Sequence, residues 1–144
     1  MTESARWPKR TNHSFIEGLF ASRCEKLIDL NLAIIRYLMD CFQIKTQIVL
    51  LSELGVKARA TQLLIEVCQA MGATAFLAQS PAKKYLEAEL FQQNGIKVRF
   101  FSYVPPIYPQ LWGDFLANLS TFDLVFNCGP KAGDILMRHQ PVAR

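Results

Sequence analysis

The sequence has 144 residues, of which 51% are apolar, and a formal net charge of +4 from 16 basic and 12 acidic side chains. A chain of this size fits one domain and can bury a conventional core without metals or disulfides. The small, scattered positive excess excludes the basic stripe with interleaved aromatic residues that marks nucleic-acid binding, so we expect no nucleic acid partner.

The four cysteines lie far apart, at positions 24, 41, 68 and 128, and form no CxxC pair. The two histidines both lie in predicted tails, so no metal site is predicted. Most of the cysteines fall in apolar helical patterns, which favours reduced core thiols of a cytoplasmic protein. The longest apolar run, residues 27–42, is interrupted by charged residues, and the N-terminus lacks the apolar core of a signal peptide. We therefore predict no membrane span.

Residues 1–21 are predicted to form a loose N-terminal tail, because the first part is polar, contains proline and has no periodicity. A long helix follows over about residues 22–43, where polar side chains recur at helical spacing. Its opposite face carries an apolar stripe, made by Leu27, Leu30, Ile34, Leu38 and Cys41. This helix is expected to pack against a substantial partner.

Three short apolar segments, residues 47–51, 74–78 and 96–102, are predicted as strands, with helices over 58–71 and 81–94 between them. Alternating strands and helices imply right-handed crossovers and parallel pairing. The predicted fold class is a three-layer α/β domain over residues 22–137. It has a small parallel sheet of about three strands with helices on both faces, Rossmann-like but without a dinucleotide motif. Residues 138–144 are predicted as a frayed C-terminal tail.

A long connection between Ser102 and Leu119 contains three prolines and four aromatic residues. Irregular segments of this length are usually functional or disordered, and this one is too aromatic for disorder. It is either an apolar cover for the end of a small core or a substrate-binding loop. The helix that begins at Ser120 carries Asp123 three residues on, and this spacing predicts a capping box. Asp123 is thus either a capping residue or a catalytic one.

Polar residues follow each predicted strand: Ser52 after the first, Gln79 and Ser80 after the second, and Ser102 and Tyr103 after the third. Ligands of open parallel sheets bind outside the carboxyl ends of the strands, so this convergence predicts a pocket. The alternative is that strand ends are polar because they meet solvent.

Phosphate-binding glycine motifs are absent from the sequence, and no cofactor is predicted. Lys83 and Lys84 open the predicted helix over 81–94, where a cation opposes the helix macrodipole. That mismatch indicates either an anionic ligand or a solvated helix start.

Several segments together resemble the C-terminal half of the WbqC-like protein family. The resemblance covers most of the chain from about Ser22 on and is carried by residues 63–77, 84–86, 91–96, 108–110 and 119–129. It implies an association with O-antigen and related surface-polysaccharide biosynthesis, and possible acyl or aminoacyl transfer to an amino sugar. The chain departs from the family pattern in two places. The family's N-terminal part has no counterpart here, and Phe76-Leu-Ala-Gln79 replaces a Tyr-Leu-Ser-Gly type segment.

Two functional hypotheses follow from these observations. In the first, the chain is a transferase acting on an activated amino sugar, with a sugar nucleotide or acyl donor as its small-molecule ligand. In the second, it is a truncated, non-catalytic α/β module that associates with a separate N-terminal half or with itself. For the first hypothesis, the catalytic candidates are Asp123, Tyr108 and Ser52. The predicted substrate-binding residues are Ser52, Gln79, Ser80, Tyr85, Tyr108, Gln110 and Asn127.

Overall fold

The structure, a computed structural model, describes residues 12–138 and 142–143. The chain divides into two compact units. One comprises residues 1–46 and 105–139, and the other comprises residues 47–104 and 140–144. We call them the helical unit and the α/β unit. The domain predicted over 22–137 spans parts of both, and its folding as a single domain stays a prediction.

Among the described residues, the helical unit contains four α-helices that pack around one core. They are α1 (Asn12–Ala21), α2 (Leu27–Cys41), α5 (Thr121–Cys128) and α6 (Ala132–Arg138), with a short 3-10 turn, η3 (Gly129–Lys131), before α6. The buried core residues are Tyr37, Cys41, Tyr108, Leu124, Val125 and Ala132. Tyr37 and Cys41 are four residues apart on α2 and so face the same side of that helix.

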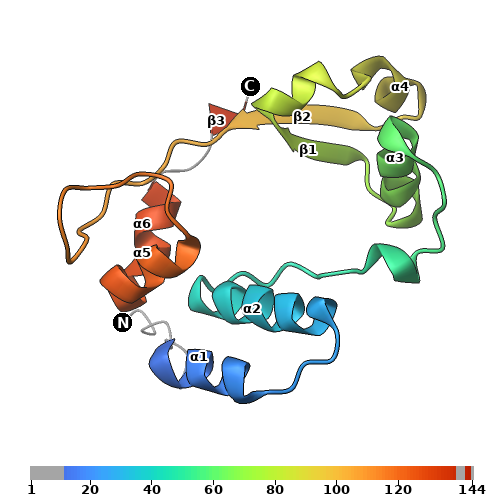
Figure 1. The fold of residues 1–144 in the computed structure, drawn as a ribbon. Coiled ribbons are helices and arrows are strands. Elements are labelled where there is room, and N and C mark those ends of the chain that lie inside the picture. The colour runs from blue at the N-terminus through green and yellow to red at the C-terminus, as the bar shows by residue number, and fades with distance from the viewer. Residues whose placement is uncertain (1–11, 139–141, 144) are drawn as a thin grey trace, which may run out of the picture. The chain divides into compact units, whose positions relative to one another are not determined.

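Helix α1 was not predicted. Residues 12–21 are helical where we expected the second part of a loose tail, while residues 1–11 lie outside the described residues. Phe15 of α1 stacks on Tyr37 of α2 with ring centroids 3.7 Å apart, so the two helices lie side by side (Figure 1). The predicted stripe of α2 is correct at Cys41, which is buried, whereas Leu27 at the other end is 71% exposed.

The α/β unit contains α3 (Ala60–Ala70), β1 (Ala75–Gln79), α4 (Ala88–Gln93), β2 (Lys97–Ser102) and β3 (Val142–Ala143). Strands β1 and β2 pair in parallel, from Ala75 opposite Lys97 to Gln79 opposite Phe101, and α4 lies in the connection between them (Figure 1). Strand β3 pairs antiparallel with the end of β2. The core of this unit is formed by Ile65, Cys68, Phe91 and Ile96. Two of the three predicted strands and their parallel pairing are thus confirmed.

The first predicted strand was wrong. Residues 44–50 form no helix or strand, and Leu51–Glu53 is a short 3-10 turn, η1. A short apolar run alone does not distinguish a strand from other structure. The run is also not covered on both faces as a buried strand would be, since Leu51 is 48% exposed. The structure is therefore α/β with a two-stranded parallel pair, and the three-layer, Rossmann-like arrangement is not confirmed.

The helix predicted over 81–94 is also interrupted. Ser80–Lys84 forms a 3-10 turn, η2, and α4 begins only at Ala88. Lys83 and Lys84 lie in the last turn of η2, so they no longer oppose a helix N-terminus. The mismatch with the macrodipole that we predicted for these lysines is absent.

All four cysteine thiols are free. Cys41 and Cys68 are buried, as predicted for core thiols, whereas Cys24 is exposed. Burial raises the pKa of the Cys41 and Cys68 thiols, which keeps them protonated and unreactive at neutral pH. Among the described residues, none of the helices combines the length and apolar character needed to cross a bilayer.

Candidate functional site

The Asp123 carboxylate lies at the centre of a polar cluster in the helical unit. Its Oδ2 atom accepts a hydrogen bond of 2.8 Å from the Tyr108 hydroxyl and another of 3.1 Å from Nε2 of Gln110. Tyr108 is only 9% exposed, and the Phe115 ring packs edge-on against it with centroids 5.7 Å apart. Burial, together with the hydrogen bond to Asp123, raises the pKa of the Tyr108 phenol. The phenol therefore remains a donor to the carboxylate at neutral pH.

Gln110 closes the loop that precedes α5. Its Nε2 donates to the Leu116 carbonyl oxygen at 2.9 Å, and its Oε1 accepts from the Leu116 backbone N–H, also at 2.9 Å. Both ends of the amide are thus bonded to the backbone of one residue, and the second Nε2 hydrogen remains for Asp123. The chain from Gln110 to Leu116 is held as a closed loop on top of Asp123.

Asn127 makes a second attachment between the loop and α5. Its Nδ2 donates to the Asp123 carbonyl oxygen one helical turn earlier, at 2.8 Å, and its Oδ1 accepts from the Leu111 N–H at 3.0 Å. We call Tyr108, Gln110, Asp123 and Asn127 the Asp123 cluster. The structure brings these predicted site residues into direct contact. The Asp123 carboxylate binds the side chains of Tyr108 and Gln110, whereas the Asn127 side chain binds the backbone of Leu111.

The capping box predicted at the start of α5 is only half formed. Ser120 is the N-cap, and its hydroxyl accepts from the Phe122 N–H at 3.2 Å. The Asp123 side chain does not return to the cap, because both donors that reach it come from the loop. Asp123 is thus a loop-binding residue in the first turn of α5, where the macrodipole also favours a carboxylate.

The long connection has a buried part and an exposed part. Tyr108 belongs to the core of the helical unit, and Pro106, two residues before it, is buried as well, as a core cover would be. Leu111 and Trp112, in contrast, are 77% and 88% exposed at the tip of the closed loop. A core cover accounts for the buried part, and a substrate-binding role of the exposed tip stays a prediction.

The strand ends of the α/β unit carry a separate pair of hydroxyl groups. Ser80 Oγ lies 3.0 Å from the Phe101 carbonyl oxygen and 2.9 Å from Ser102 Oγ. Because a carbonyl only accepts, the Ser80 proton goes to Phe101 and the Ser102 proton goes to Ser80. Both protons are then used within the protein, so this pair fastens the start of η2 to the end of β2 and offers no free donor to an anion.

The other predicted site residues lie in the α/β unit as well. Ser52 is exposed in η1, Gln79 is exposed at the end of β1, and Tyr85, which follows η2, is 81% exposed. The predicted residues are therefore divided between the two units. Their assembly around a single pocket stays a prediction.

The model of the WbqC-like protein family matches residues 9–135. The chain belongs to the WbqC-like protein family. The match begins before α1 and covers nearly the whole chain, so it is wider than the C-terminal half that the sequence resemblance predicted.

One curated relative of this WbqC-like protein is the uncharacterized protein Rv1507c of Mycobacterium tuberculosis. The two are 36% identical over 77 residues, which is 53% of this chain and 33% of the relative. The aligned part thus spans about a third of the relative's length. No solved structure matches the chain.

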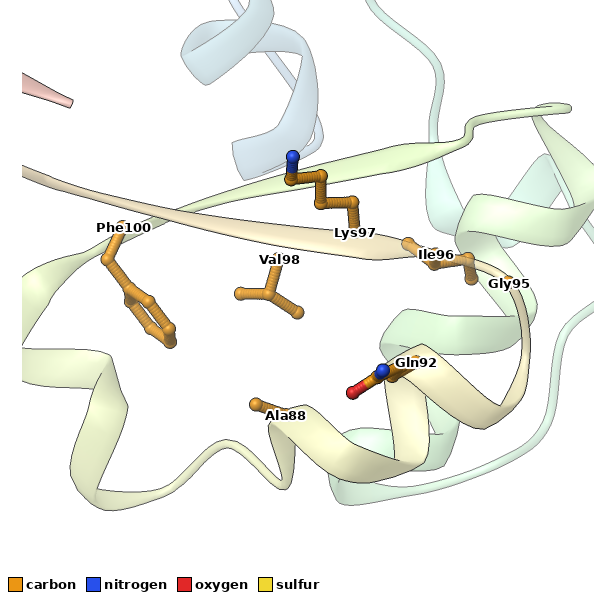
Figure 2. Close-up of a pocket in the computed structure, with 7 residues that line it drawn as sticks. All are labelled: Ala88, Gln92, Gly95, Ile96, Lys97, Val98 and Phe100. Atoms are coloured by element: carbon orange, nitrogen blue, oxygen red, sulfur yellow. The ribbon is translucent and has the colours of Figure 1, made fainter. Parts of the chain in front are cut away.

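The α/β unit of the WbqC-like protein also contains a cavity that the sequence did not predict. Its volume is about 540 Å³, and it is lined by Ala88, Gln92, Gly95, Ile96, Lys97, Val98 and Phe100. We call it the α4–β2 cavity, because these residues come from α4, from β2 and from the turn between them (Figure 2). The alternation of apolar and basic residues in β2 could have indicated it, since every second side chain of a strand faces the same way.

No group of three or more His, Cys, Asp or Glu side chains that could hold a metal ion is found among residues 12–138 and 142–143.

Proposed function

We propose that this WbqC-like protein takes part in the biosynthesis of bacterial surface polysaccharide by transferring an acyl or aminoacyl group to an activated amino sugar. The Asp123 cluster and the exposed tip of its loop would form the substrate site. The family resemblance supports the biosynthetic setting. The observation that carries the proposal is the Asp123 carboxylate, which accepts hydrogen bonds from Tyr108 and Gln110, while the loop that Gln110 closes carries the exposed Trp112.

The chemistry of the transfer requires a group that removes a proton. The amino group of the sugar attacks the acyl carbonyl carbon, a C–N bond forms, and the bond from that carbon to its leaving group breaks. The proton lost by the attacking nitrogen passes to a carboxylate, and Asp123 is suited to this task because Tyr108 and Gln110 fix its orientation. The flat ring of Trp112, which is 88% exposed, offers an apolar face to the C–H side of a sugar ring.

A cytoplasmic location forms part of this proposal. The free thiols of the chain are consistent with a reducing compartment.

Ligand titration by thermal unfolding tests the proposal. Nucleotide-activated amino sugars and acyl donors are each added to the full chain, and a ligand at 100 times its Kd should stabilise the protein by about 2.7 kcal/mol. Asp123→Asn should reduce the stabilisation, whereas Asp134→Asn is a matched control, since Asp134 is an exposed aspartate in the first turn of α6. The absence of a shift with every compound would contradict a sugar-transfer role.

A second candidate function is a non-catalytic module that associates with itself or with a separate N-terminal segment. The exposed apolar side chains of the helical unit favour this alternative, including Leu27 at 71%, Leu111 at 77% and Trp112 at 88%. Exposed apolar surface of this kind often marks an interaction site. Sedimentation velocity distinguishes the two functions, because a monodisperse monomer that binds an amino sugar excludes the association module. A dimer that is lost in Trp112→Ser, with no ligand response, supports it.

A further inference from the structure

Strand β1 lies at the edge of the sheet in the α/β unit. Among the described residues, β1 pairs with β2 on one side and with no strand on the other, whereas β2 has a partner on both sides (Figure 1). An unpaired strand edge presents backbone N–H and C=O groups that pair readily with another chain, and natural edge strands block such pairing with charges, proline or bulges. The five residues of β1, Ala-Phe-Leu-Ala-Gln, include no charge and no proline, and their pairing with β2 has no break in register. The free edge of β1 is therefore open to another strand.

The backbone groups at this free edge can be identified from the pairing with β2. The Lys97 N–H donates to the Thr74 carbonyl oxygen at 2.9 Å, so the Thr74 carbonyl points toward β2. In a strand, the N–H and C=O of one residue point to the same side, and successive residues alternate. The backbone groups of Ala75, Leu77 and Gln79 therefore point away from β2. Each of these residues offers one N–H and one C=O group at the free edge.

We propose that the free edge of β1 pairs antiparallel with β1 of a second copy of this chain, about a twofold axis at Leu77. Leu77 then lies opposite its own counterpart, and Ala75 lies opposite Gln79 of the second copy. All three are residues whose backbone groups face the free edge, so the two residues of each pair exchange both of their hydrogen bonds. This register leaves none of the outward backbone groups of β1 unpaired.

The side chains of β1 fit the same register on both faces of the sheet. Phe76 and Ala78 lie on the face that the core covers, where Phe76 is half-buried and Ala78 is 6% exposed. In the proposed pairing Phe76 lies opposite Ala78 of the second copy, so a large side chain meets a small one on each side of the axis. On the other face, Leu77, which is 59% exposed, packs on its counterpart. The strand is thus complementary to itself, as a twofold contact requires.

Neither the rest of this chain nor the candidate site competes for the edge. The apolar run at residues 47–51 joins neither edge of the sheet, so it leaves β1 open. The Asp123 cluster and Trp112 belong to the helical unit and take no part in the pairing. The proposed contact therefore differs from association through the exposed loop tip, and it neither requires nor excludes the transfer reaction.

Sedimentation velocity of the full chain over a range of concentrations tests the proposal. The parent should form a dimer, and Leu77→Lys should remain a monomer at concentrations where the parent dimerises, because two like charges would lie opposite each other. Since Leu77 is 59% exposed, this variant should keep the Tm of the parent monomer. Leu111→Lys is the matched control, because Leu111 is a 77% exposed leucine of the loop tip. It should dimerise like the parent, and so should Trp112→Ser.

Disulfide trapping checks the register of the two strands. A Cys24→Ser background removes the exposed native thiol. In this background Leu77→Cys places two thiols opposite each other at the axis, where the Cα atoms of a hydrogen-bonded pair are about 5.5 Å apart, within the range of a disulfide. Mild oxidation should therefore give a covalent dimer. Gln79→Cys places its two thiols at opposite ends of the paired segment and should give none.

Three results would overturn the proposal. A monomer at every concentration would leave the edge to residues 47–51 of the same chain or to a different protein. A dimer that survives in Leu77→Lys but is lost in Leu111→Lys or Trp112→Ser would assign the contact to the loop tip. Trapping of Gln79→Cys as efficient as that of Leu77→Cys would exclude the twofold register at Leu77.

Discussion

The hydrogen bond between Tyr108 and Asp123 can be measured by a double-mutant cycle. Tyr108→Phe removes the hydroxyl that donates to Asp123 at 2.8 Å, while the Asp123 carboxylate keeps its bond from Gln110. A hydrogen bond to a charged group contributes about 1.5–3 kcal/mol when buried. Since Asp123 is only half-buried, we expect Tyr108→Phe to lower the free energy of unfolding by about 1–2 kcal/mol.

Asp123→Ala should cost more, about 2–4 kcal/mol. This change leaves the hydroxyl of Tyr108, a residue that is 9% exposed, without its acceptor and also removes one bond from Gln110. An unpaired buried donor carries a desolvation cost of about 1–3 kcal/mol. The double variant Tyr108→Phe with Asp123→Ala loses the bond only once, so its cost should fall below the sum of the two single costs by about 1–2 kcal/mol.

Urea unfolding followed by circular dichroism measures all three variants, with Asp134→Asn as an exposed control that should stay within about 0.5 kcal/mol of the parent. Independent sites usually add within about 0.3–0.5 kcal/mol. Additivity of Tyr108→Phe and Asp123→Ala within that margin would refute the reasoning, because it would mean that the contact stores no interaction energy.

Three further predictions concern other parts of the fold. Gln110→Ala removes both hydrogen bonds to the Leu116 backbone, so limited proteolysis should cut the loop 110–116 faster than in the parent. An unchanged rate of cleavage would mean that other contacts hold the loop. Gly129→Ala should lower the free energy of unfolding by about 1–3 kcal/mol, because Gly129 has φ 52° and ψ −132°, a conformation that side chains disfavour; a neutral effect in urea unfolding would contradict this strain. Burial raises the pKa of Tyr37 from 10.0 to about 12, so the folded state resists its ionisation. The contribution of Tyr37 to stability should therefore be complete below pH 10 and should fall by about 2–3 kcal/mol between pH 10 and 12, and Tyr37→Phe should remove that part of the pH dependence.

Elements with a strong local signal were predicted correctly. The helix α5 begins after Ser120, an N-cap, and ends before Gly129, whose positive φ suits glycine. The parallel pairing of β1 and β2 followed from two apolar strands separated by a helical connection. In each case, the residues that determine the element lie within it or next to it.

Predictions that depended on distant partners did less well. The run at residues 47–51 is as apolar as β1, yet it joins neither edge of the sheet, and a short apolar pattern does not show whether a partner strand lies beside it. Helix α1 was missed because its evidence is tertiary. Phe15 of α1 stacks on the ring of Tyr37, and the short, weakly periodic sequence of α1 gives no sign of this contact.

Asp123 shows the same limit at the candidate site. Its spacing from Ser120 is a local signal, and a capping role was the simplest physical explanation of that spacing. The structure instead uses the carboxylate to hold Tyr108 and Gln110, which lie 15 and 13 residues earlier in the chain. The first turn needs an acceptor for its free N–H groups, and the Ser120 hydroxyl already accepts from the Phe122 N–H of α5. Because the helix can begin without it, the Asp123 side chain is free to fix the loop, and a substitution at this position should disturb the loop before it disturbs the helix.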